Sequence, residues 1–512
     1  MKSGNRKKHH VILIRHCVRS TKTNVKLYTT DSKTTNPVSD FTASPLPNWN
    51  VPADWCTKEA LKVIKRSGNY LMNNILYNKI DNNKHGDRRI KLHFDVVADT
   101  AYRDVDTALS LSLGIKEVLN DLHDRIEATG IDNLRYDPVL FKPLEGTQDL
   151  GHVIDRPFCT SSFSQKERAN QIFKRLQSLP KPSIDLNKTI SMLEERGGVG
   201  RTGSMRSLSS TYEFELYHDG NIKGSINAVK LIAQMMFYSR AGGIDPPFIP
   251  EATVDEVYIA LAWAHYARSV VSMDNVKVAL KGAILADTVI RSLQGENDQT
   301  YDEKVTILVG HDTNMDSLAT AMGLRWNMPL PFHQSGHGEF MATPPGSIMY
   351  FVHDKESSDL KMSYLFPIMV TDDSQTGKSY HLNNTGILES IPMIFREGVK
   401  EAKNYDFSKD HATSTITSSE FDKTVVDVLR ERTVAVLSAY PEASECFSSI
   451  TKLENSMNTV SRRDQGVLQF NMDTYFLAGL FCISLFVFYV RHRSKKLFTY
   501  SKVEIDDGGI NA

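Results

Sequence analysis

Near the N-terminus the chain reads Val11-Ile12-Leu13-Ile14-Arg15-His16-Cys17-Val18-Arg19-Ser20, an apolar run that stops at charged side chains. Its four apolar residues are too few for a helix and show no solvent-facing alternation, which is typical of a strand buried on both faces of a parallel sheet. In open α/β sheets, ligands bind beyond the carboxyl ends of the strands. That end carries Arg15, His16 and Arg19. Two guanidinium groups beside one imidazole predict a site for an anion, above all phosphate.

Two other segments repeat this arrangement. A second buried strand is predicted for Val305-Thr306-Ile307-Leu308-Val309, which leads into Gly310-His311-Asp312. A third strand is predicted over 94–99, and Arg103 follows it closely. If these strands are parallel, their carboxyl ends meet at one edge of the sheet. We therefore predict a single site made of Arg15, His16, Arg19, Arg103, His311 and Asp312.

These side chains suit the hydrolysis of a phosphate monoester. Cationic donors stabilise the charge that the phosphoryl oxygens carry in the transition state. A neutral imidazole can attack phosphorus and form a phosphoenzyme. The departing alkoxide then needs a proton, and Asp312 is the nearby carboxyl group in the sequence motif.

Two motifs, Arg15-His16-Cys17-Val18-Arg19 and Gly310-His311-Asp312-Thr313-Asn314, together resemble the signatures of the histidine acid phosphatases. This group contains the prostatic and lysosomal acid phosphatases and the bacterial phytases. The resemblance spans residues 9–365 and includes Ala98-Asp99, Thr107-Ala108, Gly323-Leu324-Arg325-Trp326 and Pro344-Pro345-Gly346.

The resemblance implies a phosphoglycerate-mutase-like α/β fold, a three-layer α/β/α domain with an inserted, mostly α-helical cap. It also implies an acid phosphatase that works through a covalent phosphohistidine. His16 would be the nucleophile and Asp312 the proton donor. The phosphate would be bound by Arg15, Arg19, Arg103 and His311. We expect no metal and no cofactor.

The chain departs from the family pattern at two positions. Cys17 stands where the family has Gly, and Thr21 stands where it has Pro. Gly allows close backbone approach, and Cys is small enough for the loop to keep its shape. One alternative is therefore a catalytically impaired, phosphate-binding surface protein of the same fold. A narrower alternative is a phytase-like inositol phosphate phosphatase, for which Lys22, Lys26 and Arg268 are weak candidates as further cations.

Cys17 and the other cysteines are candidates for a nucleophile and for disulfide partners. Cysteine phosphatases carry an Arg six residues after the nucleophile, and that position is Thr23, so we exclude Cys17 as the nucleophile. Nearby Arg side chains would make a free Cys17 thiol sensitive to oxidation. Five cysteines are few for a disulfide scaffold. Apart from Cys17 and Cys482, one disulfide is compatible with the remaining three, Cys56, Cys159 and Cys446.

The hydrophobic patterns predict a catalytic domain in two parts, 9–120 and 301–370, separated by the cap at 121–300. A C-terminal extension and stalk follow at 371–473. Helical spacing predicts helices over 58–79, 104–120, 164–179, 229–236, 254–269, 276–292 and 421–440. Strands over 347–352 and 361–366 are predicted to form a hairpin. His265 lies in one of the apolar helices and is expected in the core or at the edge of the substrate site.

A C-terminal transmembrane helix is predicted at 474–490, with a short cytoplasmic tail at 491–512. Its sixteen uncharged residues Tyr475–Val490 precede a basic cluster that begins at Arg491, which is typical of a cytoplasmic flank. The chain would thus be a single-pass membrane protein with an extracytoplasmic or lumenal catalytic domain. Sequons at Asn187 and Asn383 agree with such a glycoprotein. The N-terminus reads as lacking a signal peptide. We expect either that the true N-terminus with its signal precedes this sequence, or, as the alternative, a tail-anchored protein with a cytosolic catalytic domain.

The expected partners are a small-molecule phosphate monoester and, through the C-terminal helix, the membrane. The formal net charge of −1 gives no electrostatic preference for nucleic acid.

Overall fold

The computed structural model describes most of residues 7–449. The residues in this range that it does not describe are 22–25, 29–34, 78–88, 138–139, 141–169, 209–223, 271–274, 296–299, 329–342, 372–379, 383–385, 396–414 and 417–423, together with positions 173, 176–177, 179–180, 183, 202 and 368.

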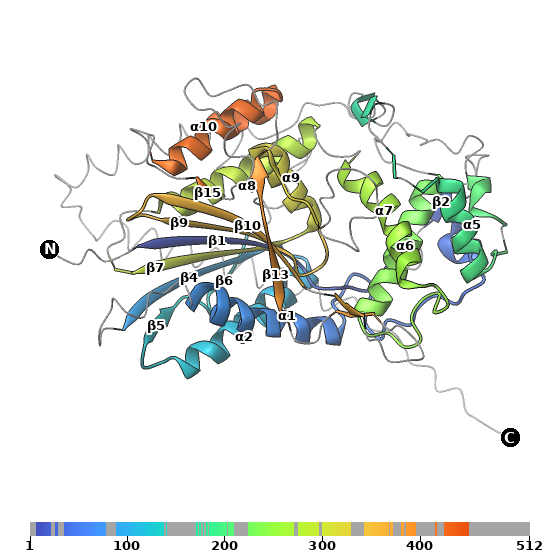
Figure 1. The fold of residues 1–512 in the computed structure, drawn as a ribbon, viewed down its shortest axis with the longest axis horizontal. Coiled ribbons are helices and arrows are strands. Elements are labelled where there is room, and N and C mark those ends of the chain that lie inside the picture. The colour runs from blue at the N-terminus through green and yellow to red at the C-terminus, as the bar shows by residue number, and fades with distance from the viewer. Residues whose placement is uncertain are drawn as a thin grey trace, which may run out of the picture. The chain divides into compact units, whose positions relative to one another are not determined.

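The core of the fold is a mixed sheet of nine strands, in which seven follow the order β13-β10-β9-β1-β7-β4-β5 (Figure 1). Strand β1 (Lys8–Arg15) lies in the middle, and all of its residues are buried. Strands β1, β7 (Glu303–Gly310), β4 (Ile90–Ala98) and β5 (Ile126–Thr129) pair in parallel with one another, in that order across the sheet. The short β6 (Leu134–Tyr136) also pairs in parallel with β4. The prediction that the three site-bearing strands are parallel is confirmed.

The other half of the sheet is antiparallel. Strands β9 (Ile348–Asp354) and β10 (Asp359–Pro367) form the predicted hairpin, and β9 pairs with β1. The edge strands β13 (Leu388–Pro392) and β15 (Thr415–Ile416) both pair with β10. Smaller pairs are β2 (Lys26–Tyr28) with β3 (Thr35–Pro37), β8 (Leu324–Arg325) with β14 (Ile394–Phe395), and β11 (Met369–Thr371) with β12 (Tyr380–Leu382).

Helices cover both faces of the sheet, which gives the predicted three layers. One face carries α1 (Lys58–Tyr70), its π-helical continuation η2 (Leu71–Leu76) and α2 (Tyr102–Asp121). The backbones of α1 and α2 touch, since a Cβ on Gly114 would overlap the carbonyl oxygen of Lys65. The other face carries α8 (Val276–Gln294), α9 (Asp312–Met322) and α10 (Val425–Leu437).

The remaining helices gather near the carboxyl ends of β1 and β7, and we call them the helical cap. They are α5 (Leu186–Gly197), α6 (Ser225–Ala241), α7 (Val254–His265) and the π-helical η6 (Tyr266–Val270), with the 3₁₀ turns η1 (Val38–Phe41) and η5 (Met205–Leu208) against α6. Helix α7 begins with a capping box between Thr253 and Glu256. The domain boundaries stay a prediction, although α8, inside the predicted 121–300 insertion, packs on the sheet rather than in the helical cap.

Several predictions fall outside the described residues: the transmembrane helix at 474–490, Lys22, Cys159, Cys482 and the sequon at Asn383. Of the helix predicted at 164–179, the described positions 170–172, 174–175 and 178 are helical. Asn187 is described and lies in the first turn of α5. Within the part of the chain that the structure describes, none of the helices combines the length and the apolar character needed to cross a membrane. The membrane anchor therefore stays a prediction.

Candidate active site

The structure brings the six predicted site residues together. Arg15 pairs with Gly310 in the register of β1 and β7, and the amide of His16 donates to the carbonyl of Gly310 at 2.9 Å. The end of β4 is in the same register, with Ala98 opposite Val309. The residues that follow the three strands therefore share one edge of the sheet, which is the geometry that parallel pairing predicts.

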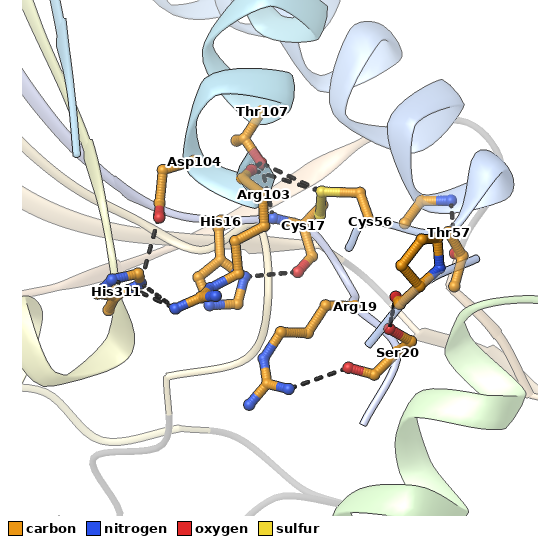
Figure 2. Close-up of a disulfide and its surroundings, with 12 residues drawn as sticks. His16, Cys17, Arg19, Ser20, Cys56, Thr57, Arg103, Asp104, Thr107 and His311 are labelled. Carbon is orange, nitrogen blue, oxygen red and sulfur yellow. Dashed lines mark hydrogen bonds and ion pairs between the residues drawn. A yellow bond between two sulfur atoms is a disulfide. The ribbon is translucent and has the colours of Figure 1, made fainter. Parts of the chain in front are cut away.

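His16 is a buried imidazole that presents one nitrogen. Its Nδ1 lies 2.8 Å from the carbonyl oxygen of Cys17 (Figure 2). Because a carbonyl only accepts, Nδ1 carries the hydrogen and Nε2 carries the lone pair. Burial, followed by the charge of Arg15, lowers the pKa of His16 well below its ordinary value. The imidazole is therefore neutral at physiological pH, as a nucleophile must be.

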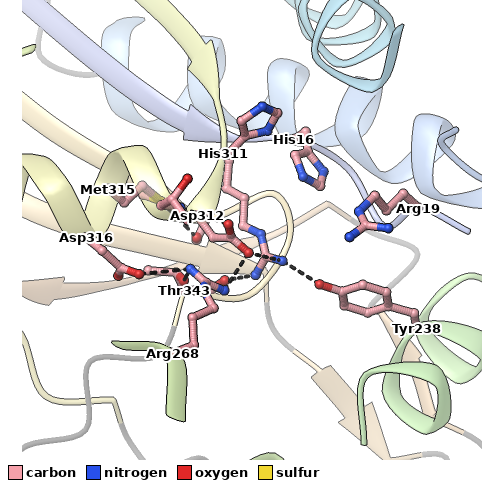
Figure 3. Close-up of polar contacts among 12 residues, drawn as sticks. His16, Arg19, Tyr238, Arg268, His311, Asp312, Met315, Asp316 and Thr343 are labelled. Atoms are coloured by element: carbon pink, nitrogen blue, oxygen red, sulfur yellow. Dashed lines mark hydrogen bonds and ion pairs between the residues drawn. The ribbon is translucent and has the colours of Figure 1, made fainter. Parts of the chain in front are cut away.

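Asp312 is the first residue of α9 and forms two ion pairs. Its Oδ2 lies 2.8 Å from Nη2 of Arg15 and 2.5 Å from Nη1 of Arg268 (Figure 3). Burial opposes ionisation of this carboxyl, but the Arg15 and Arg268 charges outweigh it and lower the pKa of Asp312 below its ordinary value. The carboxyl is consequently ionised in the protein without substrate.

Arg268 joins the helical cap to α9. Its Nη2 lies 3.0 Å from Oδ2 of Asp316 and donates to the Thr343 hydroxyl at 3.2 Å. Asp312 and Asp316 are four residues apart, so they share one face of the helix. From the sequence, Arg268 was predicted only as a weak candidate for a further cation in the substrate site. Asp316 was missed, although the i, i+4 spacing of the two carboxylates was a readable signal.

Tyr238 of α6 reaches between the guanidinium groups of Arg15 and Arg19. Nη2 of Arg15 donates to its hydroxyl oxygen at 2.5 Å. The guanidinium carbons of Arg15 and Arg19 each lie 6.0 Å from the centre of its ring. Figure 3 shows the tyrosine pointing from the cap into the site. No pattern in the sequence indicated this role, because an aromatic residue in an apolar helix is usually a core residue.

Among the predicted site residues that form ion pairs, Arg19 has the most exposed side chain. Its Nη1 lies 2.5 Å from Oδ1 of Asp54 and donates to the Ser20 carbonyl at 3.0 Å. Another cation missed by the sequence analysis is Lys230 on α6, which is half-buried. Burial, followed by repulsion from Arg268, lowers the pKa of Lys230, while Asp312 acts in the opposite direction.

His311 is held by two buried carboxylates. Its Nε2 lies 2.9 Å from Asp99 and its Nδ1 lies 3.3 Å from Asp104, while the His16 ring is 5.3 Å away between ring centres. Arg103 stands beside the ring, with Nη2 at 3.4 Å from Nε2 of His311. The predicted hydrogen bond from His311 to a phosphate is formed only if the ring gives up one of these carboxylates.

Asp99, Asp104 and His311 are also the described residues that could hold a metal ion, since their ligand atoms all lie within 4.8 Å of one another. The guanidinium of Arg103 beside His311 adds a positive charge that disfavours a divalent cation. We interpret the group as an ion-pair network, and the expected absence of a metal stays a prediction.

The cysteine assignment needs a correction. Cys17 forms a disulfide with Cys56, so it is not a free thiol, and leaving it out of the possible pairing partners was wrong. The partner is brought close by an antiparallel bridge between Arg19 and Cys56, a tertiary contact that spacing along the chain does not reveal. Cys446 is disulfide-bonded as well.

Two minor candidates remain. Burial, followed by the charge of Arg268, lowers the pKa of the partly buried His265 to about 3, which keeps the imidazole neutral near the site. Lys26 lies in β2, and its side chain is not described.

Comparisons with known proteins support the fold. No protein-family model matches the chain. The chain is 22% identical over 367 residues to the phytase AppA of Escherichia coli K12, which covers 68% of this chain and 77% of that protein. The phytase structure of Citrobacter braakii matches with a TM-score of 0.55 and 16% identity over 85% of this chain and 98% of that one. The apo phytase of Hafnia alvei matches with a TM-score of 0.54 and 14% identity over 86% and 99%. The predicted mixed α/β fold around a central sheet is therefore confirmed.

Proposed function

We propose that this protein is a phosphatase that hydrolyses phosphate monoesters through a covalent phosphohistidine on His16. The observation that carries the proposal is the neutral imidazole, whose Nδ1 is fixed to the Cys17 carbonyl at 2.8 Å while Nε2 is left to attack. It shares one site with Arg15 and with Asp312, the carboxyl group that can supply a proton.

In the first step, Arg15, Arg19 and Arg103 bind the phosphate, and Nε2 of His16 attacks phosphorus. The bond to the ester oxygen breaks, and Asp312 protonates that oxygen so that it leaves as an alcohol. In the second step, water attacks the phosphohistidine and gives a proton back to Asp312. The N–P bond breaks, and inorganic phosphate is released.

Asp312 must gain a proton before the first step, although it is ionised in the free protein. The phosphate dianion competes with Asp312 for Arg15, which removes a stabilising cation from the carboxylate. It also brings negative charge close to Asp312. Both effects raise the pKa of Asp312, so substrate binding prepares the acid for its role.

A phytase-like activity on inositol phosphates is the second candidate. It is supported by the names of the similar proteins, which are phytases. A substrate with several phosphates needs further cations, and the helical cap offers Lys230 and Arg268 near the site. Arg268, however, is already paired with Asp312 and Asp316. We therefore propose phosphate monoesters as the general class, with inositol phosphates as one member to be tested.

The test is hydrolysis of p-nitrophenyl phosphate by the full chain between about pH 4 and 7, next to His16→Ala. We expect turnover by the parent protein, none by the variant, and an acid-labile phosphoenzyme that only the parent forms. Lys188→Ala, on the exposed surface of α5, is a matched control. Phosphate binding without turnover would instead support the impaired surface protein. Hydrolysis of inositol hexakisphosphate, compared at equal concentration, separates the two enzyme candidates.

We also propose that the catalytic domain lies outside the cytoplasm. The Cys17–Cys56 disulfide and the disulfide-bonded Cys446 support this location, because disulfides persist mainly in oxidising compartments. A mobility shift of the expressed protein after glycosidase treatment is the expected result. Protease-accessible phosphatase on intact organelles, without any shift, would favour the cytosolic alternative.

A further inference from the structure

We propose that the Cys17–Cys56 disulfide is a positioning element of the phosphatase reaction, which holds the loop after β1 so that His16 presents Nε2, and that its reduction lowers turnover reversibly. The inference rests on the proposed function. Figure 2 shows the disulfide between the nucleophile and the first turn of α2.

The backbone of Cys17 is fixed at both ends of the residue. Its amide donates to the Thr107 hydroxyl at 2.9 Å, and its carbonyl accepts from Nδ1 of His16 at 2.8 Å. The side chain is bonded to Cys56 and is 1% exposed. A rotation of this residue would turn the carbonyl away from His16, and the carbonyl is what keeps the hydrogen on Nδ1.

At its other end, the disulfide lies against the backbone of Arg103, another proposed phosphate ligand. Its sulfur is 3.4 Å from the carbonyl oxygen of Arg103 and 3.8 Å from the Thr107 hydroxyl oxygen. That hydroxyl donates to the same Arg103 carbonyl at 2.6 Å. One covalent link thus fixes the loop that carries the nucleophile against the helix turn that carries Arg103.

Backbone hydrogen bonds on both sides of the disulfide would survive its loss. The amide of Ser20 donates to the Trp55 carbonyl at 2.9 Å, and the amide of Thr57 donates to the Val18 carbonyl at 3.1 Å. The two segments therefore stay paired without the sulfur bridge. The effect of its loss is expected in the placement of His16 rather than in the fold of α1.

The size of the effect follows from the loss of the covalent tether. Cys17 and Cys56 are 1% and 4% exposed, so the bridge is packed on all sides in the intact protein. Cys56→Ala leaves a space where the sulfur was, and the loop after β1 can then shift into it. A misplacement of about 1 Å at a reacting group can cost about a hundredfold in rate. We expect a loss of at least about tenfold in kcat.

The redox step is a thiol–disulfide exchange. A dithiol reductant supplies two electrons and two protons, the bond between Cys17 and Cys56 breaks, two thiols form, and the reductant becomes a disulfide. Because the bridge is buried, exchange in the folded protein is expected to be slow. The main test therefore uses cysteine variants, and chemical reduction of the parent protein is a second test.

The experiment compares the full chain with Cys56→Ala and with the control Cys446→Ser, which removes the other disulfide-bonded cysteine. For Cys56→Ala we expect kcat on p-nitrophenyl phosphate to fall at least about tenfold, with nearly unchanged inhibition by orthophosphate, which needs only the cations. Under the proposed function, vanadate would bind as a five-coordinate mimic of the transition state through Nε2 of His16. Its affinity is therefore expected to fall with kcat. The control should retain all three values.

The pH profile gives a readout that a purely structural role would not move. The burial that lowers the pKa of His16 depends on a closed loop. Loosening the loop admits water, so the acidic limb of activity is expected to move to higher pH in Cys56→Ala. Dithiothreitol should reproduce the loss in the parent protein slowly, reoxidation should restore it, and Cys56→Ala should not respond.

Two outcomes would overturn the inference. One is unchanged kcat, vanadate affinity and pH profile in folded Cys56→Ala. The other is an equal loss in Cys446→Ser that tracks thermal unfolding. Failure of the proposed function looks different, because the parent protein would then show no turnover that depends on His16. In that case, weaker vanadate binding by Cys56→Ala would still support the positioning role.

Discussion

Asp312→Asn tests whether this carboxyl is the acid, because the substitution keeps the shape of the side chain and removes its proton and charge. A general acid contributes about a hundredfold to ten-thousandfold to the rate when the leaving group is poor. An alkyl phosphate such as glycerol 2-phosphate needs that proton, whereas p-nitrophenolate is stable without it. We expect kcat to fall by about 10²–10⁴ for the alkyl ester and far less for the aryl ester.

The same substitution should tighten the binding of phosphate. Asp312 competes with the phosphate for Arg15, which it contacts at 2.8 Å, and its side chain is only 18% exposed. A hydrogen bond to a charged group contributes about 1.5–3 kcal/mol. Arg15 keeps its contacts with Tyr238 and Thr343 in either case, so we take the lower end. Orthophosphate should inhibit the variant at about tenfold lower concentration.

The assay is steady-state hydrolysis of both esters, with orthophosphate as a competitive inhibitor. Lys188→Ala serves again as the control for handling and expression. Equal losses of kcat for the alkyl and the aryl ester would refute the acid role of Asp312. Weaker inhibition by orthophosphate would refute the argument that Asp312 and the substrate compete for Arg15.

Three further predictions follow from single contacts. Tyr238→Phe removes the oxygen that accepts from Arg15 at 2.5 Å. It should therefore lower kcat/KM on p-nitrophenyl phosphate about fivefold, the equivalent of about 1 kcal/mol, and an unchanged value would contradict the role of the hydroxyl. Gly114→Ala would place a Cβ against the carbonyl of Lys65. It should lower the free energy of unfolding by about 1–3 kcal/mol in urea titrations, and a neutral effect would show that α1 and α2 can separate. Burial, followed by the charge of Lys355, lowers the pKa of His9 from 6.5 to about 3, so the unfolded chain binds a proton in this window that the folded chain does not. Stability should therefore fall as the pH drops from about 6.5 towards 3, and less so in His9→Gln, as thermal denaturation at several pH values would show.

The sequence predicted the centre of the sheet and the six-residue site because one local pattern carries both. Each site-bearing strand is an apolar run that ends in polar or charged residues, and parallel pairing then brings those ends together. The pattern needs no knowledge of distant contacts. For this reason the sequence alone is enough to place Arg15, His16 and Asp312 in one site.

What the sequence did not reveal depends on packing between distant segments. Tyr238 enters the site because the helical cap covers the strand ends, and Cys56 does so because its segment pairs with the loop after β1. In α2 the large apolar residues do not mark the buried face. Leu109 and Leu113 are about half exposed, at 54% and 50%. The buried face is built around small residues such as Gly114, where α1 approaches closely.

Arg15 and Arg19, two of the proposed phosphate ligands, are each paired with a carboxylate, and they differ in the pair that a bound phosphate would have to displace. Arg19 and Asp54 are 24% and 26% exposed, so water screens their pair and phosphate replaces it at little cost. Arg15 and Asp312 are 5% and 18% exposed, so phosphate meets a stronger competitor there. Of these two pairs, only Arg15–Asp312 contains the proposed acid, so competition at Arg15 also changes the environment of that acid. In the proposed mechanism, phosphate displaces Asp312 from Arg15 and leaves it paired with Arg268 alone, so the pKa of the carboxyl rises towards the range in which it can take up a proton. Binding of a phosphate dianion and readiness of the acid are thereby one event, and a ligand that engages only Arg19 would leave Asp312 ionised.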